Sequence, residues 1–412
     1  MNALSKAAFR AWLVVALLWP VACLNYLDRL MITTMRDSLK ADIAMTDAQF
    51  GLLTSVFLWV YAVLSPFAGF FADRFSRSRV IVASLLVWSA VTWLTGHAQD
   101  FNQLLLARAF MGVSEACYIP AALALITDYH RGPTRSLATG LHMSGLYAGA
   151  ALGGLGGVLA EHFKWQSAFS LFGAVGVGYS VLLVLALRDV RPAADLAGKA
   201  EAPAGKVRLW SALGYVAREG SFWALVTYFA VLSIAYWAIY GWLPTYLGQH
   251  FKLGQGAAGM SATAYLQTAS LFGVLIGGAW ADGWCRRNLR GRLFVPLVGF
   301  CAAGPALFLA ASTDLLLVAI GGLIVFGLAR GFADANNMPI LCQVVPPRYR
   351  ATGYGVLNFV GCVLGGVMTY AAGALSDAQV GLERVFQFCA GGVVVAVLVL
   401  LLVKPKKALE ES

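Results

Sequence analysis

Charged side chains are scarce in this sequence. Only 12% of its 412 residues are Asp, Glu, Lys or Arg, whereas 59% are hydrophobic, and the mean hydropathy is +0.73. Soluble domains typically carry about 25% charged residues. The composition therefore excludes an ordinary soluble protein and is typical of a chain whose solvent is mostly lipid.

Several signatures of enzymes and of metal proteins are also missing. The sequence has no Gly-x-x-x-x-Gly-Lys-Ser/Thr phosphate loop, no cluster among its five histidines and no extramembrane domain to house an active site. Its seven cysteines form no CxxC pair, and five of them lie within apolar segments. We therefore expect no enzyme, no metal site, no disulfide framework and no bound cofactor.

What the sequence has in abundance is long apolar segments. Twelve are recognised, and each is long enough to cross the ~30 Å hydrocarbon core as a helix. The first is too long for the core of a signal peptide, so we expect it to remain as the first helix. The predicted fold is an all-α membrane protein. The segments span about residues 11–36, 48–72, 79–96, 101–127, 136–160, 166–187, 221–247, 258–281, 293–311, 315–345, 351–376 and 385–403.

The basic residues predict the orientation in the bilayer. With an even number of crossings both termini share one side, which takes 22 of the 30 Lys and Arg residues, while five lie on the other side and three within the membrane. The positive-inside rule then places both termini in the cytoplasm. The net charge of +10 mostly reflects this topology, so we expect no nucleic-acid partner. The outer loops contain no Asn-x-Ser/Thr glycosylation site, which favours a bacterial inner membrane. We also expect the protein to be a monomer.

A short motif occurs twice, 209 residues apart, in corresponding loops after the second and eighth segments. An Asp with basic neighbours at the cytoplasmic surface can form an ion pair that breaks and re-forms, so we predict a conformational latch in each copy. The polar stretch at 188–220 is then a linker between two halves, 1–187 and 221–412. The first copy comprises Gly69, Asp73, Arg74 and Arg77, and the second comprises Gly278, Asp282 and Arg286.

The first copy resembles the Gly-x-x-x-Asp-Arg-x-Gly-Arg-Arg loop motif of the major facilitator superfamily. Ser76 replaces the second glycine and Ser78 the last basic residue, and the second copy is looser, with Gly283 in place of an arginine. The resemblance covers essentially the whole chain. It implies two pseudo-symmetric six-helix bundles that rock about a central substrate site.

The first and fourth apolar segments each carry two charged residues in their interior, where a charge costs about 2.5 to 3.5 kcal/mol. Asp28 and Arg29 belong to the first segment, and Arg108 and Glu115 to the fourth. Arg29 and Arg108 each lie about 10 Å below the outer end of their helix, so both guanidinium groups can meet one ligand. Glu115 is seven residues beyond Arg108, two turns deeper on nearly the same face.

The chemistry of these residue types suggests two roles. The planar fork of arginine donates two parallel hydrogen bonds to a carboxylate and keeps its charge in a dry cavity. Burial disfavours the charged form of an acid, so Asp28 and Glu115 can take up and release protons. The alternative is that Asp28, Arg29, Arg108 and Glu115 close on one another as internal salt bridges that only hold helices together.

The surroundings of these charges narrow the resemblance. Asn25-Tyr26-Leu27-Asp28-Arg29, with Arg108, Glu115 and the stretch Trp242 to Leu247, resembles the anion:cation symporter branch, which includes sugar-acid carriers and sialin. That branch implies arginines for the anion and acids for the proton, hence proton-coupled symport of a sugar acid or similar monocarboxylate. The Spinster lipid transporters, with a similar first helix and a stretch like Gly112 to Tyr118, are the alternative and imply a lysolipid substrate.

Other residues are candidates of lesser weight. Tyr26, Tyr61 and Asn358 can bind the sugar-like part of a substrate. For the two tyrosines the case is strengthened by the family resemblance, because tyrosines in membrane helices often only pack. For His142 two interpretations stay open: it lines the cavity, or it is a packing group. Arg330 and Asp334 are four residues apart, and we expect them to form a structural pair. Glycines at four-residue spacing predict close helix packing, at Gly145, Gly149, Gly153, Gly273 and Gly277.

Overall fold

The computed structural model describes residues 3–130, 134–189 and 209–406, with side chains for all of these except 3–7, 68–73, 136, 209–210 and 212. Twelve of the described helical segments are long and apolar enough to cross a membrane. In such a helix every backbone polar group bonds within the segment, which lipid requires. The prediction of an all-α, multi-pass membrane protein with twelve spans is therefore confirmed.

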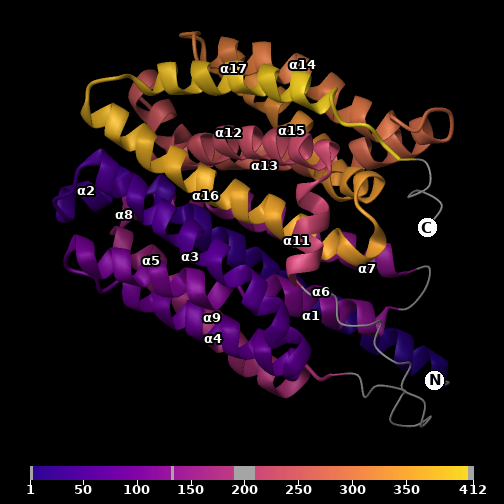
Figure 1. Ribbon diagram of the computed structural model, residues 1–412. Helices are drawn as coiled ribbons and strands as arrows, with labels where there is room; N and C mark the ends of the chain where they lie inside the picture. The colour runs from indigo at the N-terminus through magenta and orange to yellow at the C-terminus, as the bar shows by residue number, and fades with distance from the viewer. Residues whose placement is uncertain (1–2, 131–133, 190–208, 407–412) are drawn as a thin grey trace.

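The helices form two groups, drawn from indigo to magenta and from rose to yellow in Figure 1. The first contains α1 (Ala3–Met31), η1 (Ile32–Thr34), α2 (Arg36–Asp42), α3 (Asp47–Arg74), α4 (Arg77–Thr95), α5 (Phe101–Glu115), α6 (Tyr118–Tyr129), α7 (Arg135–Leu152), α8 (Leu155–His162) and α9 (Trp165–Ala186). The second contains α11 (Leu209–Ala217), α12 (Gly220–Phe251), α13 (Gln255–Cys285), α14 (Gly291–Ala310), α15 (Leu316–Val344), η2 (Pro347–Tyr349), α16 (Arg350–Asp377) and α17 (Leu382–Leu400).

Two ends of the bundle can be told apart. The described ends of the chain lie together at one end, which we call the terminal face, and α2 and α8 lie at the other, the opposite face (Figure 1). The short helix α11 packs on α12 and α16. It lies within the stretch 188–220 that we assigned as a linker, of which residues 190–208 are outside the described ranges.

Two spans are interrupted where the sequence suggested continuous helices. The fourth span breaks at Ala116 and Cys117, between α5 and α6. Pro120 explains the position, because proline has no amide hydrogen to donate to the carbonyl of Ala116 and its ring crowds that carbonyl. The fifth span breaks at Gly153 and Gly154, and a glycine pair is a common place for a helix to bend. The first break directly follows a charged residue of the predicted site.

The predicted glycine stripes are confirmed. A Cβ added at Gly149 would overlap the backbone of Cys23, so α7 lies directly against α1. On the other half, a Cβ at Gly277 would lie 2.7 Å from Cα of Phe332, which places α13 equally close to α15. The contact at Gly149 holds α1, which carries Asp28 and Arg29, against α7.

Helix caps join the two halves at the opposite face. The Asp377 carboxylate, at the end of α16, accepts hydrogen bonds from the amides of Asp47 and Ala48 at the start of α3, both at 2.8 Å. Glu161 of α8 accepts a hydrogen bond from the amide of Gly256 at the start of α13, at 2.6 Å. The first amides of a helix have no partner within it, so both carboxylates satisfy otherwise orphaned donors. The halves are thus closed against each other at this face.

Contacts between the halves continue from the caps toward the middle of the bundle. The hydroxyl of Ser55 in α3 donates to the carbonyl of Gly366 in α16 at 2.6 Å, and the indole of Trp59 donates to the carbonyl of Val363 at 3.1 Å. Helix α13 packs in the same way along α7 and α8. Contacts between the halves thus run along α3 and α16 on one side and along α13, α7 and α8 on the other.

Candidate functional site

Arg29 of α1 and Glu115 at the end of α5 form a buried ion pair. Nε of Arg29 donates to Oε2 of Glu115 at 2.6 Å, and Nδ2 of Asn25 donates to the same oxygen at 2.9 Å. Asn25 and Arg29 are four residues apart and therefore share one face of α1. The side chains of Arg29 and Glu115 are 5% and 0% exposed, so their attraction is weakly screened.

Asp28 and Arg108 form no second ion pair in the described structure. Nη1 of Arg108 instead donates to the backbone carbonyl of Asp28 at 3.4 Å and contacts the sulfur of Met111 at 2.9 Å. The Asp28 carboxylate accepts a hydrogen bond from the hydroxyl of Thr92 at 3.3 Å. A buried carboxylate and a buried guanidinium with only neutral partners are costly, so a proton or a ligand that supplies the missing charge would be stabilised.

Each of the four charged groups keeps one buried atom that has no hydrogen-bond partner among the described residues. These atoms are Nη2 of Arg29, Nη2 of Arg108, Oδ1 of Asp28 and Oε1 of Glu115. Two are donors and two are acceptors. The donors suit the two oxygens of a carboxylate, and each acceptor can hold a proton.

Aromatic rings enclose both guanidinium groups. The Cζ atom of Arg29 lies 4.8 Å from the ring centroid of Tyr26, 4.7 Å from that of Tyr61 and 5.1 Å from that of Phe57. Phe57 also lies 4.9 Å from Cζ of Arg108, so one ring contacts both arginines. Cation–π contacts of this kind stabilise a charge without neutralising it. The structure thus brings Tyr26, Tyr61, Arg29 and Arg108 together around Phe57, and their binding of one ligand stays a prediction.

The second half has a charged cluster of its own. Arg330 and Asp334 of α15 lie 3.3 Å apart, from Nε to Oδ2. Asp334 also accepts a hydrogen bond at 3.0 Å from the hydroxyl of Tyr147 in α7, which belongs to the first half. Nη1 of Arg330 donates to Oε1 of Gln267 in α13 at 3.3 Å. The expected pair therefore exists, and it also links the two halves.

The remaining candidates are Asn358 and His142, for which the described contacts include no hydrogen bond to the four charged residues. Asn358 of α16 is half-buried, and its Oδ1 lies 3.9 Å from the sulfur of Cys362. His142 is buried with its ring 5.8 Å from that of Tyr118. Neither of its ring nitrogens has a partner within the described ranges. Its contacts are those of a packing group within the first half.

The predicted latch residues lie at the ends of α3, α4 and α13. The side chain of Asp73 is outside the described set. Arg77 pairs with Asp128 of α6. In the second copy Asp282 pairs with Arg292 of α14 at 3.5 Å, and Arg286 is exposed. Arg292 thus takes the place that we expected for Arg286, because the start of α14 faces Asp282. The latch itself stays a prediction.

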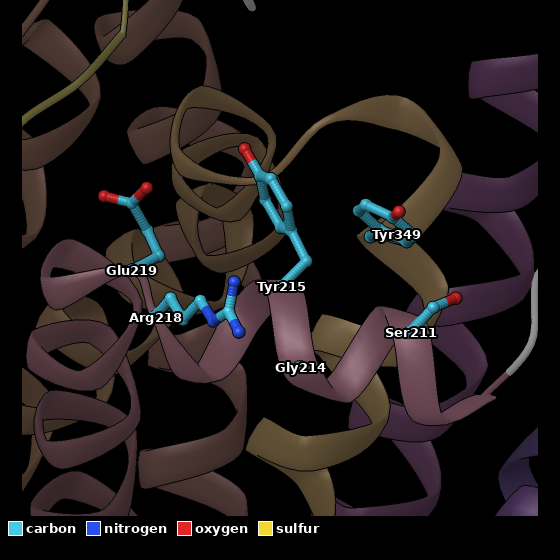
Figure 2. A pocket seen from close by; sticks show the side chains of 6 residues that line it. All are labelled: Ser211, Gly214, Tyr215, Arg218, Glu219 and Tyr349. Carbon is cyan, nitrogen blue, oxygen red and sulfur yellow. The ribbon is translucent and has the colours of Figure 1, made fainter.

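A cavity of about 520 Å³ opens on the terminal face of the second half. Figure 2 shows Tyr215 of α11 beside Tyr349 of η2, with Arg218 and Glu219 to one side. The two rings are 4.9 Å apart, and Glu219 pairs with Lys406. The residues that line the cavity include none of the predicted site, so this cavity is separate from the buried charges.

Sequence reasoning missed several residues of the site. Asn25 was quoted as part of a motif without a role, although its spacing of four from Arg29 is a usable signal. Phe57, Thr92 and Tyr147 come from other helices, and their identities carry no sign of the charges that they contact. Their roles depend on how the helices pack.

Twelve spans in two groups, with buried charges of both signs between helices, are typical of a secondary transporter. The sequence profile of the Major Facilitator Superfamily matches residues 18–370. The chain belongs to this superfamily and is a transporter, not an enzyme. The resemblance proposed from the loop motif is thereby confirmed.

The relatives fall into more than one functional class. An MFS-type efflux pump of Mycolicibacterium smegmatis is 30% identical over 89% of this chain and 85% of its own length. Protein spinster homolog 1 of Xenopus tropicalis is 27% identical over 88% of this chain and 72% of its own length. A probable sulfoacetate transporter of Cupriavidus necator is 26% identical over 81% of this chain and 80% of its own length.

The fold also matches a solved structure. A bacterial homologue of the human lysosomal transporter Spinster, in an inward-facing and unoccupied conformation, superposes with a TM-score of 0.76. The match covers 96% of this chain and 95% of the other, at 23% sequence identity. At that identity the likeness concerns the fold alone.

Proposed function

We propose that the protein is a proton-coupled symporter that moves a small organic anion, a sugar acid or similar monocarboxylate, across the bacterial inner membrane. The observation that carries the proposal is the set of four buried charges. Arg29 and Arg108 each hold one free donor beside the same ring, that of Phe57, and two acids lie with them. Few other functions need two buried arginines and two buried acids close together within membrane-spanning helices.

Charge arithmetic supports the coupling to protons. The net charge of the four side chains is zero when both acids are ionised; they are Asp28, Arg29, Arg108 and Glu115. A bound monoanion would then leave one negative charge in low dielectric, which is costly. One proton on either acid restores neutrality. Glu115 is our choice, because protonating its carboxylate would release Nε of Arg29 for the substrate.

Uptake into proteoliposomes tests this proposal, with the pH gradient and the voltage imposed separately. We expect accumulation when the outside is acidic. One proton per monoanion gives no response to voltage, whereas two would add about 2.3 kcal/mol per 100 mV across the full field. Accumulation driven by a sodium gradient, with no response to pH, would refute proton coupling.

The topology is part of the proposal. The excess of Lys and Arg at the terminal face supports cytoplasmic termini. A reporter that is active only in the periplasm, fused to the C-terminus, should stay inactive. Activity of that fusion would reverse the orientation, and with it the direction of the pH gradient that drives uptake.

A second candidate is transport of a lysolipid. The relatives described as Spinster proteins favour it, as do the aromatic rings around Arg29. A thermal-shift assay of the purified protein separates the two: hydrophilic carboxylates should stabilise a sugar-acid carrier, and lysophospholipids a lipid carrier. Stabilisation by lysophospholipids alone would favour the second candidate.

A further inference from the structure

We propose that Arg330 and Asp334 form a second substrate subsite, in which the C-terminal half binds the hydroxyl groups of the substrate. The inference rests on the proposed function and assigns these two residues a binding role. Because Asp334 is bound by Tyr147 of the opposite half at 3.0 Å, the pair lies where the two halves meet.

The Arg330–Asp334 pair is more exposed than the ion pair of the first half. The side chains of Arg330 and Asp334 are 12% and 27% exposed, against 5% and 0% for Arg29 and Glu115. Both residues lie near the middle of the 29-residue helix α15, far from either end. Space large enough for water therefore reaches this point, although Tyr147 partly covers it.

The two charged clusters face the same region. The ring of Tyr26 lies 4.8 Å from the guanidinium of Arg29, and both residues belong to α1. Helix α1 packs along α7, whose Tyr147 ring lies 6.0 Å from Cζ of Arg330. A molecule held by Arg29 at one end can thus reach Arg330 and Asp334 with the other.

The surroundings of Arg330 leave hydrogen-bonding capacity unused. Its guanidinium lies 5.0 Å from the ring centroid of Tyr236 and 4.5 Å from that of Tyr240. The hydroxyls of both tyrosines are buried without a hydrogen-bond partner in the described part of the chain. Unsatisfied buried donors are costly, so a ligand that accepts their hydrogen bonds is favoured.

Charge decides the class of ligand. The subsite is neutral, because Asp334 compensates Arg330, so a second anionic group would again leave an unpaired charge. A hydroxyl is neutral and both donates and accepts, which matches one carboxylate and one guanidinium side by side. The group bound here is therefore a hydroxylated chain attached to the carboxylate that Arg29 and Arg108 hold.

Isothermal titration of the purified protein tests the inference with two probes, gluconate and hexanoate. Both have six carbons and one carboxylate, and only gluconate carries hydroxyls. We expect wild type to prefer gluconate, and Asp334→Asn and Arg330→Gln each to weaken gluconate about 10- to 100-fold while hexanoate changes less than about twofold. Tyr147→Phe removes one hydroxyl, leaves the pair intact and should cost gluconate several-fold.

Tyr179→Phe is the matched control, because the hydroxyl of Tyr179 donates to the backbone of Leu17 within the first half, at 2.8 Å. It should leave both affinities unchanged. Equal binding of the two probes by wild type, or a parallel loss of both in the Asp334 and Arg330 variants, would show that the pair is only a brace and would leave the anion site standing. Binding of neither probe by wild type would reject both the inference and the proposed function.

Discussion

Replacing Glu115 by glutamine should separate binding from coupling. The substitution keeps an oxygen that can accept the hydrogen bonds of Arg29 and Asn25, at 2.6 and 2.9 Å in the native protein. It removes one negative charge, so the sum over Asp28, Arg29, Arg108 and residue 115 changes from zero to +1. A monoanion then restores neutrality without a proton. We expect Glu115→Gln to bind the substrate at least as tightly as wild type, with little dependence on pH.

The size of the effect on transport follows from one proton per turnover. A gradient of one pH unit is worth 1.36 kcal/mol per proton, which sustains about tenfold accumulation in wild type. Glu115→Gln should reach no accumulation from the same gradient. Its exchange of labelled for unlabelled substrate, which needs no net proton movement, should persist.

The assay is accumulation and exchange in proteoliposomes with an imposed pH gradient. Loss of a buried charge partner can cost about 3 to 5 kcal/mol, so folded protein must be measured in parallel. Glu219→Gln is the control, because Glu219 also pairs with a basic side chain, Lys406, at the terminal face. Tenfold accumulation by folded Glu115→Gln would refute the assignment of Glu115 as the coupling group.

Three further outcomes follow from the described contacts. Arg29→Lys and Arg108→Ala should each lower substrate affinity by 100-fold or more in folded protein, because neither a point charge nor a methyl group replaces the fork; normal affinity by titration would reject the anion clamp. Gly149→Ala should lower the melting temperature by forcing α7 away from α1, whereas Gly140→Ala, with open space around it, should not. Asp377→Asn should widen the distance between spin labels on the ends of α3 and α16 at the opposite face; an unchanged distance distribution would show that the cap does not hold this face closed.

Much of the fold was accessible from sequence because lipid leaves few choices. A span must be helical and apolar, so its position can be read locally, and glycines at four-residue spacing show where neighbours approach. The break after Glu115 was also readable in principle, since Pro120 removes the bond to Ala116. It was missed because the apolar pattern continues through the break.

The site was only partly accessible. Depth along two helices brought Arg29 and Arg108 together, because a helix has a fixed rise per residue. The same reasoning did not indicate which acid would meet which arginine. That choice depends on the rotation of α1 against α5, which the packing of Gly149 on Cys23 helps to set. The bond from Tyr147 to Asp334 joins residues that are 187 positions apart, and no local pattern predicts it.

In each of the two caps at the opposite face, only one of the two partners contributes a side chain. Asp377 and Glu161 act through their carboxylates, whereas Ala48 and Gly256 contribute only backbone amides, which every residue but proline carries. In a library of single substitutions the two acid positions should therefore be intolerant, while position 48 accepts most replacements. Position 256 should be stricter, because a Cβ there would lie 2.7 Å from a carboxylate oxygen of Glu161.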